Sequence, residues 1–237
     1  MFIGVGNPIP RIANLPGVSR PGGGGGGGGG LAQVDNLYSF EFDGSTALID
    51  LGTDVLFDST GGFSISAWVY LDGYTASFPA IVKLITDKSA TSNTCWSMGL
   101  SNTAGYTGVF FGSSSDFAKS RTDGDISGDF IGAWKHVCVT FDGVDRGALS
   151  SYKIYVNGVN ITLVAAGAFG ATSTASSTIG WAISTNYWNG KIDEVGIFNV
   201  ALTNPEVLSI YNATTTGKTA DLNALSTPPT RWYRMGD

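Results

Sequence analysis

The chain has 237 residues, of which 43% are hydrophobic and only 14% are charged, and its formal net charge at pH 7 is −6. This length suits one large β-sandwich domain with extensions at its ends. The basic residues are scattered along the chain. This excludes nucleic acid as a partner, because phosphates require clustered Lys and Arg. The acidic balance also gives the chain no attraction to an anionic membrane surface.

Residues 1–30 differ in composition from the rest of the chain. Residues 1–21 are rich in Pro and Gly, and nine consecutive glycines follow at 22–30. Composition favours a disordered tail with a flexible spacer. The alternative is an extended arm, ordered by neighbouring chains in a homo-oligomer or other multi-copy assembly. The apolar side chains that would anchor this arm to another protein are Phe2, Ile3, Val5, Ile9, Ile12 and Leu15.

The first 17 residues do not resemble a secretory signal. They lack a basic start, and Asn7, Pro8 and Pro10 interrupt their apolar residues. Elsewhere, no stretch reaches the ~18 consecutive apolar residues of a membrane span. We therefore expect neither export by this route nor membrane insertion.

Alternating apolar and polar residues predict short strands from Leu37 onward. In residues 38–43, Tyr38, Phe40 and Phe42 share one face, and residues 63–71 alternate in the same way. Asn157-Gly158 predicts a hairpin with a type I′ turn, because both positions of that turn need positive φ. Further predicted strand segments are residues 46–52, 80–86, 94–101, 107–112, 134–143, 152–164, 177–181 and 190–199.

One short helix is predicted near the end of the chain. Thr203 and Glu206 have the spacing of a capping box, with Pro205 in the first turn. These residues predict a helix over about 204–212. The organisation expected from the sequence is an arm (1–30), a β domain (31–213) and a polar C-terminal tail (214–237) that ends in RWYRMGD.

Five segments in the expected order resemble the laminin-G-like jelly-roll domains of the concanavalin A-like lectin superfamily. They are YSFEFDGSTALIDLG (38–52), FSISAWVYL (63–71), WKHVCVTFDG (134–143), YKIYVNGV (152–159) and the segment 179–212, which contains NGKIDEVGIFNVALTNPEVLSIYN. The resemblance implies an all-β fold of two antiparallel sheets packed as a jelly-roll sandwich. It also implies binding roles toward glycans, proteins or cell surfaces. The glycine tract and the RWYRMGD ending are further similar to virion structural proteins of marine tailed phages.

The carboxylates do not predict an enzyme. Retaining glycosidases need two carboxyl groups about 5–5.5 Å apart. Glu41 and Asp43 lack the further Glu that the hydrolases of this superfamily carry. Asp193 and Glu194 are adjacent, so a regular strand would direct them to opposite faces.

The single histidine and the two cysteines are interpreted structurally. His136 is expected to form a hydrogen bond across a sheet rather than act in a catalytic triad. Cys95 and Cys138 are either bridged or separate small core residues, and the sequence leaves both alternatives open.

Two candidate sites remain. Asp43 and Asp193 match acidic positions that hold a structural calcium ion in some relatives; the alternative is an Asx turn at Asp43 and backbone hydrogen bonds to Asp193. No other cofactor is expected. Tyr187 and Trp188 lie in a turn-rich stretch, so they are predicted as an exposed aromatic pair that binds glycans.

Together these features predict a non-enzymatic virion structural protein of the capsid-decoration or head-fibre type, assembled in the host cytoplasm. It would display a lectin-like domain for particle stabilisation or host-surface attachment. Its partners would be other virion proteins, bound through the arm, and cell-surface glycans. The alternatives are a carbohydrate-binding module of a bacterial cell-surface protein, a phage tail-fibre or adhesin component, and a degenerate glucanase.

Overall fold

The computed structural model describes residues 30–52, 61–89, 92–104, 107–113, 120–122, 126–145, 147–165, 176–182, 184–215 and 217–235. The predicted anchor residues and glycines 22–29 lie outside these ranges. No helix within them is long and apolar enough to cross a membrane.

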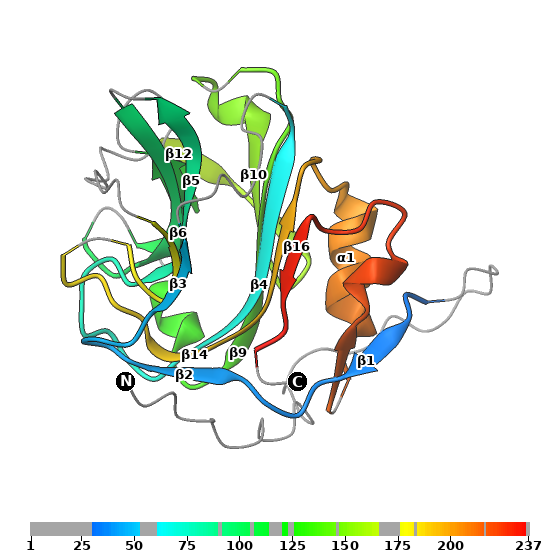
Figure 1. Ribbon diagram of the computed structural model, residues 1–237, viewed down its shortest axis with the longest axis horizontal. Helices are drawn as coiled ribbons and strands as arrows, with labels where there is room; N and C mark the ends of the chain where they lie inside the picture. Colours follow the sequence, from blue (N-terminus) through cyan, green and yellow to red (C-terminus); the bar gives the residue numbers. More distant parts are fainter. Residues whose placement is uncertain are drawn as a thin grey trace.

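Two antiparallel sheets lie face to face (Figure 1). The first sheet contains β2 (Phe40–Asp43), β4 (Phe63–Leu71), β9 (Trp134–Phe141), β10 (Tyr152–Val156), β11 (Val159–Ile161), β14 (Asn189–Phe198) and β16 (Arg231–Tyr233). Its order is β11-β10-β9-β4-β14-β16, and β2 also pairs with β14. The all-β sandwich inferred from the sequence is therefore confirmed.

The second sheet contains β3 (Ile49–Gly52), β5 (Ala80–Ser89), β6 (Ser92–Ser101), β7 (Gly108–Ser113), β8 (Ser120–Thr122), β12 (Leu163–Ala165) and β13 (Ser177–Ile179). Its order is β12-β8-β7-β6-β5-β13-β3. Outside both sheets, the described chain forms α1 (Asn204–Ala213), a two-stranded pair of β1 (Gln33–Asp35) and β15 (Lys218–Ala220), and the 3₁₀ helices η1 (Ser127–Phe130), η2 (Leu149–Ser151) and η3 (Leu222–Ala224).

The main core fills the space between the two sheets. Phe63 and Ile65 of β4 point into it, while Trp96 and Phe111 enter from the second sheet. The rings of Phe63 and Trp96 meet edge to face at 5.4 Å, and those of Trp96 and Phe111 stack at 4.8 Å. The predicted alternation in β4 is confirmed, because burial between two sheets selects every second side chain of a strand.

Helix α1 covers the outer face of the first sheet (Figure 1). Val207 and Ile210 pack there against Cys138, Tyr155 and Phe198. The predicted capping box is present, since the backbone N–H of Thr203 donates to Glu206 Oε2 at 2.8 Å. The capping box at Thr203 thus begins the helix that the sequence predicts.

The hairpin between β10 and β11 has the predicted turn. Asn157 and Gly158 have φ values of 51° and 76°, as a type I′ turn requires. A Cβ on Gly158 would also come within 2.9 Å of Leu208 on α1. Glycine here therefore serves both the turn and the close approach of the helix.

The C-terminal residues take part in the fold. The sequence sets residues 214–237 apart as a tail, but β16 pairs with β14 through Val195↔Tyr233 and Ile197↔Arg231. Strand β15 pairs with β1 near the beginning of the described chain. These strands are only three residues long, which is too short for alternation to identify them from the sequence.

Candidate functional site

The loop between β13 and β14 holds two aromatic side chains that are partly open to solvent. Trp181 and Tyr187 form an antiparallel bridge, and their rings lie 5.9 Å apart at 33°. Both residues are half-buried. Trp181 Nε1 donates a hydrogen bond to the carbonyl of Ser184 at 3.1 Å, across a turn in which Ser184 has a φ of 52°. We call Trp181 and Tyr187 the aromatic pair.

Trp188 is not exposed, so its prediction as a surface glycan contact is wrong. Its side chain is fully buried in the main core, and its Nε1 donates to the carbonyl of Tyr70 at 3.2 Å. Neighbouring side chains in an extended segment point in opposite directions. When Tyr187 faces outward at the start of β14, Trp188 must therefore face inward.

A polar row of the second sheet lies at this site. Lys83 of β5 pairs with Thr178 on one side and with Ser97 on the other, and Thr178 pairs in turn with Asp50. Thr178 Oγ1 donates to the carbonyl of Trp181 at 2.5 Å. The row therefore crosses four strands, β3, β13, β5 and β6, and Thr178 joins it to the loop that carries the aromatic pair.

Lys83 is an unusual member of this row. Its side chain is fully buried, and its Nζ lies 4.6 Å from the centroid of the Trp181 ring. Within the described part of the chain, this ammonium has no hydrogen-bond partner. Burial lowers the pKa of Lys83 below its usual 10.5, while Cys95 and Asp50 act in the opposite direction. Sequence analysis missed this residue, because a single Lys in an apolar strand does not reveal which ring it contacts.

Asp43 forms the Asx turn given above as the alternative to a calcium site. Its Oδ1 accepts hydrogen bonds from the backbone N–H groups of Ser45, Thr46 and Ala47, and its Oδ2 accepts one from the Thr46 hydroxyl. These hydrogen bonds hold the pKa of Asp43 far below its usual value. Its carboxylate thus fixes the turn that follows β2.

Asp193 and Glu194 do not point to opposite faces, and the sequence expectation is wrong here. Both are buried, because the register of β14 shifts between Asp193 and Gly196 and Glu194 takes a φ of 52°. This is a β-bulge, which redirects side chains by inserting an extra residue. Asp193 Oδ1 accepts hydrogen bonds from the N–H groups of Glu194 and Met235. Burial, and then the charge of Glu194, raise the pKa of Asp193.

The C-terminal segment encloses Glu194. Trp232 Nε1 donates to its Oε2 at 2.5 Å, while Asn36 and Thr219 donate to its Oε1, each at 2.8 Å. Arg234 Nε lies 3.7 Å from the same Oε1. Glu194 therefore ties the ends of the described chain to the bulge in β14.

The structure does not bring the two proposed calcium ligands together. Asp43 pairs with Asn189, four residues before Asp193 on β14, which corresponds to about 13 Å along a strand. The two carboxylates are therefore too far apart to ligate one ion. Across the described ranges, no three or more His, Cys, Asp or Glu residues gather in a way that could hold a metal.

His136 forms the predicted hydrogen bond across the sheet. Its Nε2 lies 2.8 Å from Ser66 Oγ on neighbouring β4. The imidazole is fully buried beside the Trp68 ring, and burial lowers its pKa to about 3. Cys95 and Cys138 are buried in different sheets, and no disulfide joins them.

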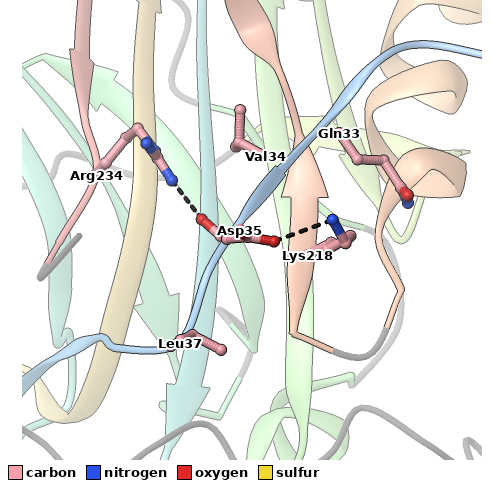
Figure 2. A pocket seen from close by; sticks show the side chains of 6 residues that line it. All are labelled: Gln33, Val34, Asp35, Leu37, Lys218 and Arg234. Carbon is pink, nitrogen blue, oxygen red and sulfur yellow. Dashed lines mark hydrogen bonds and ion pairs between the residues drawn. The ribbon is translucent and has the colours of Figure 1, made fainter.

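A shallow depression lies beside β1 and β15 (Figure 2). Asp35 lies at its centre: its carboxylate is 3.0 Å from Lys218 Nζ, and its carbonyl accepts a hydrogen bond from Arg234. We call this arrangement the β1–β15 clasp. The residues that line it are Gln33, Val34, Asp35, Leu37, Lys218 and Arg234. It has no aromatic lining and fixes the chain just after the described part begins.

Comparison with known proteins identifies the fold family. Residues 43–208 match the model of the concanavalin A-like lectin/glucanases superfamily. No curated protein matches the sequence. Among solved structures, domain 4 of AbnA, a GH43 extracellular arabinanase from Geobacillus stearothermophilus solved with arabinotriose, is 27% identical. The alignment covers 76% of this chain and 81% of that one, with a TM-score of 0.52.

A protein from Bacteroides ovatus, described as having a proposed carbohydrate-binding role, has the same fold with 16% identity and a TM-score of 0.52. The alignment covers 86% of this chain and 52% of that one, so this chain spans about half of its length. Since the family model covers residues 43–208, well over half of the sequence, the chain belongs to the concanavalin A-like lectin/glucanases superfamily.

Proposed function

We propose that the chain is a non-enzymatic carbohydrate-binding protein whose ligand stacks on Trp181 and Tyr187. The observation that carries this proposal is the geometry of the aromatic pair, which is half-exposed and whose Trp181 is held by side-chain hydrogen bonds to backbone carbonyls. Rigid aromatic surfaces with a few polar neighbours are the usual lining of small-molecule sites. The similarity to domain 4 of AbnA, whose structure contains arabinotriose, supports a carbohydrate as the ligand class.

The positions of the acids favour binding over hydrolysis. Glycosidases need two carboxyl groups that flank the bond to be cleaved. Asp193 and Glu194 are buried beneath the C-terminal segment, and Asp43 is used in its turn. None of these three acids belongs to the loop or the polar row that forms the aromatic site.

We further propose that the protein acts on a virion, as a capsid-decoration or head-fibre component assembled in the host cytoplasm. The segment that leads from β13 into β14 lies to the left in Figure 1, and β1 lies to the right. A chain anchored through Phe2, Ile3, Val5, Ile9, Ile12 and Leu15 would therefore hold the sugar site away from its attachment point. Many copies would strengthen weak binding to host glycans by ~10²–10⁴.

A second candidate is a carbohydrate-binding module of an exported bacterial protein. The observation that favours it is the 27% identity to a domain of an extracellular bacterial enzyme. Mass spectrometry of purified particles separates the two proposals. Absence of the protein from particles would contradict the virion role and leave carbohydrate binding in place.

Variants of the aromatic pair test the binding proposal directly. Glycan-array screening of the full chain, followed by calorimetry, should find a ligand that Trp181→Ala and Tyr187→Ala each bind at least about tenfold more weakly, since aromatic anchors dominate such sites. Tyr38→Ala is the matched control, because Tyr38 is 39% exposed and lies outside the site. Unchanged affinity in Trp181→Ala, or equal loss in Tyr38→Ala, would contradict the site assignment.

A further inference from the structure

Lys83 combines full burial with an ammonium that has no hydrogen-bond partner in the described chain. Burying a polar group without a partner is unfavourable. The next cross-strand pair on this face, Ile85 and Cys95, is composed of apolar side chains. The fold alone therefore does not require a lysine at position 83, and a buried group of this kind is a candidate functional residue.

The contact of Lys83 with Trp181 links this lysine to the proposed sugar site. The ammonium lies 4.6 Å from the ring centroid and is completely enclosed, whereas Trp181 is only half-buried. The indole face toward Lys83 is therefore covered. A ligand that stacks on the opposite face of the indole would leave Lys83 in place behind the ring.

A cation on one face of an aromatic ring changes what the other face attracts. The negative face of the ring is already engaged by the ammonium, and the positive charge is felt through the ring. An anion stacked on the outer face would lie about 8 Å from Nζ, with protein rather than water between the charges, so their attraction stays significant. A neutral sugar gains nothing from this charge.

Asp50 and Cys95 are the groups whose charges act on Lys83. Asp50 is exposed, lies two strands from Lys83, and its Oδ1 accepts a hydrogen bond from the Gly52 N–H. The charge of Asp50 reduces the attraction for an anionic ligand, but nothing in this arrangement places the Asp50 carboxylate on the Trp181 ring. Because the whole chain has a net charge of −6, any preference for an anion must come from a local group.

We infer that the aromatic pair selects an acidic glycan, whose sugar carries a carboxylate, and that Lys83 sets this preference by acting through Trp181. This inference rests on the proposed carbohydrate-binding function and specifies its ligand class. Lys83 is a specificity-determining residue that does not contact the glycan, because the Trp181 indole lies between them.

The test compares two matched probes on the full chain: trigalacturonic acid and the neutral galactose trisaccharide of the same linkage. The wild type should bind the acidic probe more tightly. Lys83→Met should weaken binding of the acidic probe by about fivefold to tenfold, the attraction expected across this distance, and leave the neutral probe unchanged. Lys83→Arg should restore the preference. Lys191→Met is the matched control, because Lys191 lies 4.9 Å over the Tyr70 ring on the other sheet.

The outcomes separate the two proposals. A wild type that binds both probes equally, or a Lys83→Met variant that loses both equally, overturns the role of Lys83 but leaves carbohydrate binding intact. A wild type that binds neither probe nor any glycan on the array overturns both. If Lys83→Met does not fold, the salt dependence of the wild type decides: the acidic preference must shrink as ionic strength rises, and a preference independent of salt overturns the inference.

Discussion

His136 is buried beside two aromatic rings, with the Trp68 centroid at 5.3 Å and the Tyr211 centroid at 6.3 Å. In this buried position only its hydrogen bond to Ser66 compensates for lost water. Burial lowers its pKa to about 3, so the folded protein keeps this imidazole neutral. The same physical effect lowers the pKa of Lys83. At the scale of single residues, burial shifts both pKa values downward, but only the imidazole starts from a pKa near neutrality and therefore loses its proton.

His136 should make the protein less stable as the pH falls. In the unfolded chain it takes up a proton near its usual pKa of 6.5, whereas the folded chain resists protonation down to about 3. Its contribution is complete above pH 6.5 and declines below that pH by about 1.4 kcal/mol per pH unit. Urea unfolding of the wild type and of His136→Gln at several pH values should show the shallower pH slope in the variant.

Asp193 contributes with the opposite sign, because its pKa is raised in the folded state. Acidification therefore favours folding through Asp193 while it opposes folding through His136. Because both proteins contain Asp193, its effect cancels in the difference between their free energies of unfolding, and this difference is the quantity to follow with pH. Parallel pH slopes for the two proteins would show that His136 is not the group that resists protonation.

Local interactions define the start of helix α1, whereas long-range interactions accompany the bulge in strand β14. The helix begins at a local capping box, in which Glu206 and Thr203 satisfy each other's backbone groups. The bulge of β14 depends on distant residues instead, because Trp232 and Asn36 must supply hydrogen bonds to Glu194. The positive φ of Glu194 is thus accompanied by hydrogen bonds to residues far away in the chain rather than by a local sequence signal.

Removal of the Thr203 cap at the start of α1 should lower the stability of the folded protein. Thr203→Ala removes the side-chain acceptor of the Glu206 N–H and should lower the free energy of unfolding by about 1 kcal/mol. Thr203→Ser keeps the hydroxyl and should cost much less. Chemical denaturation measures both, and equal losses would mean that the methyl group of Thr203, not its cap, carries the effect.

At the scale of the whole molecule, the β1–β15 clasp and the aromatic pair belong to different sides of the sandwich. Helix α1 and β1 lie on the outer side of the first sheet (Figure 1). The aromatic pair lies at the second sheet, where Lys83 of β5 contacts Trp181. Both cores are composed of residues from Leu31 onward. Removal of residues 1–29 tests the prediction that the arm is separate from the folded domain.

Deletion of residues 1–29 should leave the melting temperature and carbohydrate binding unchanged, because the Pro- and Gly-rich composition of this segment does not favour a packed core. The same deletion should abolish incorporation into particles if the arm is the anchor. Differential scanning calorimetry and particle co-purification measure the two effects. A large drop in melting temperature would show that the arm belongs to the fold.

The sequence by itself determined those features whose signals lie within a few residues of one another. Alternation predicts β4, a capping box predicts α1, and Asn157-Gly158 predicts a hairpin, because each depends on local backbone geometry. Only the tertiary structure decided that Trp188 is buried while Tyr187 is half-exposed, and that Lys83 meets Trp181. These outcomes depend on strand register and on contacts between segments far apart in the chain. A pattern within a few residues carries no information about strand register or about contacts between distant segments.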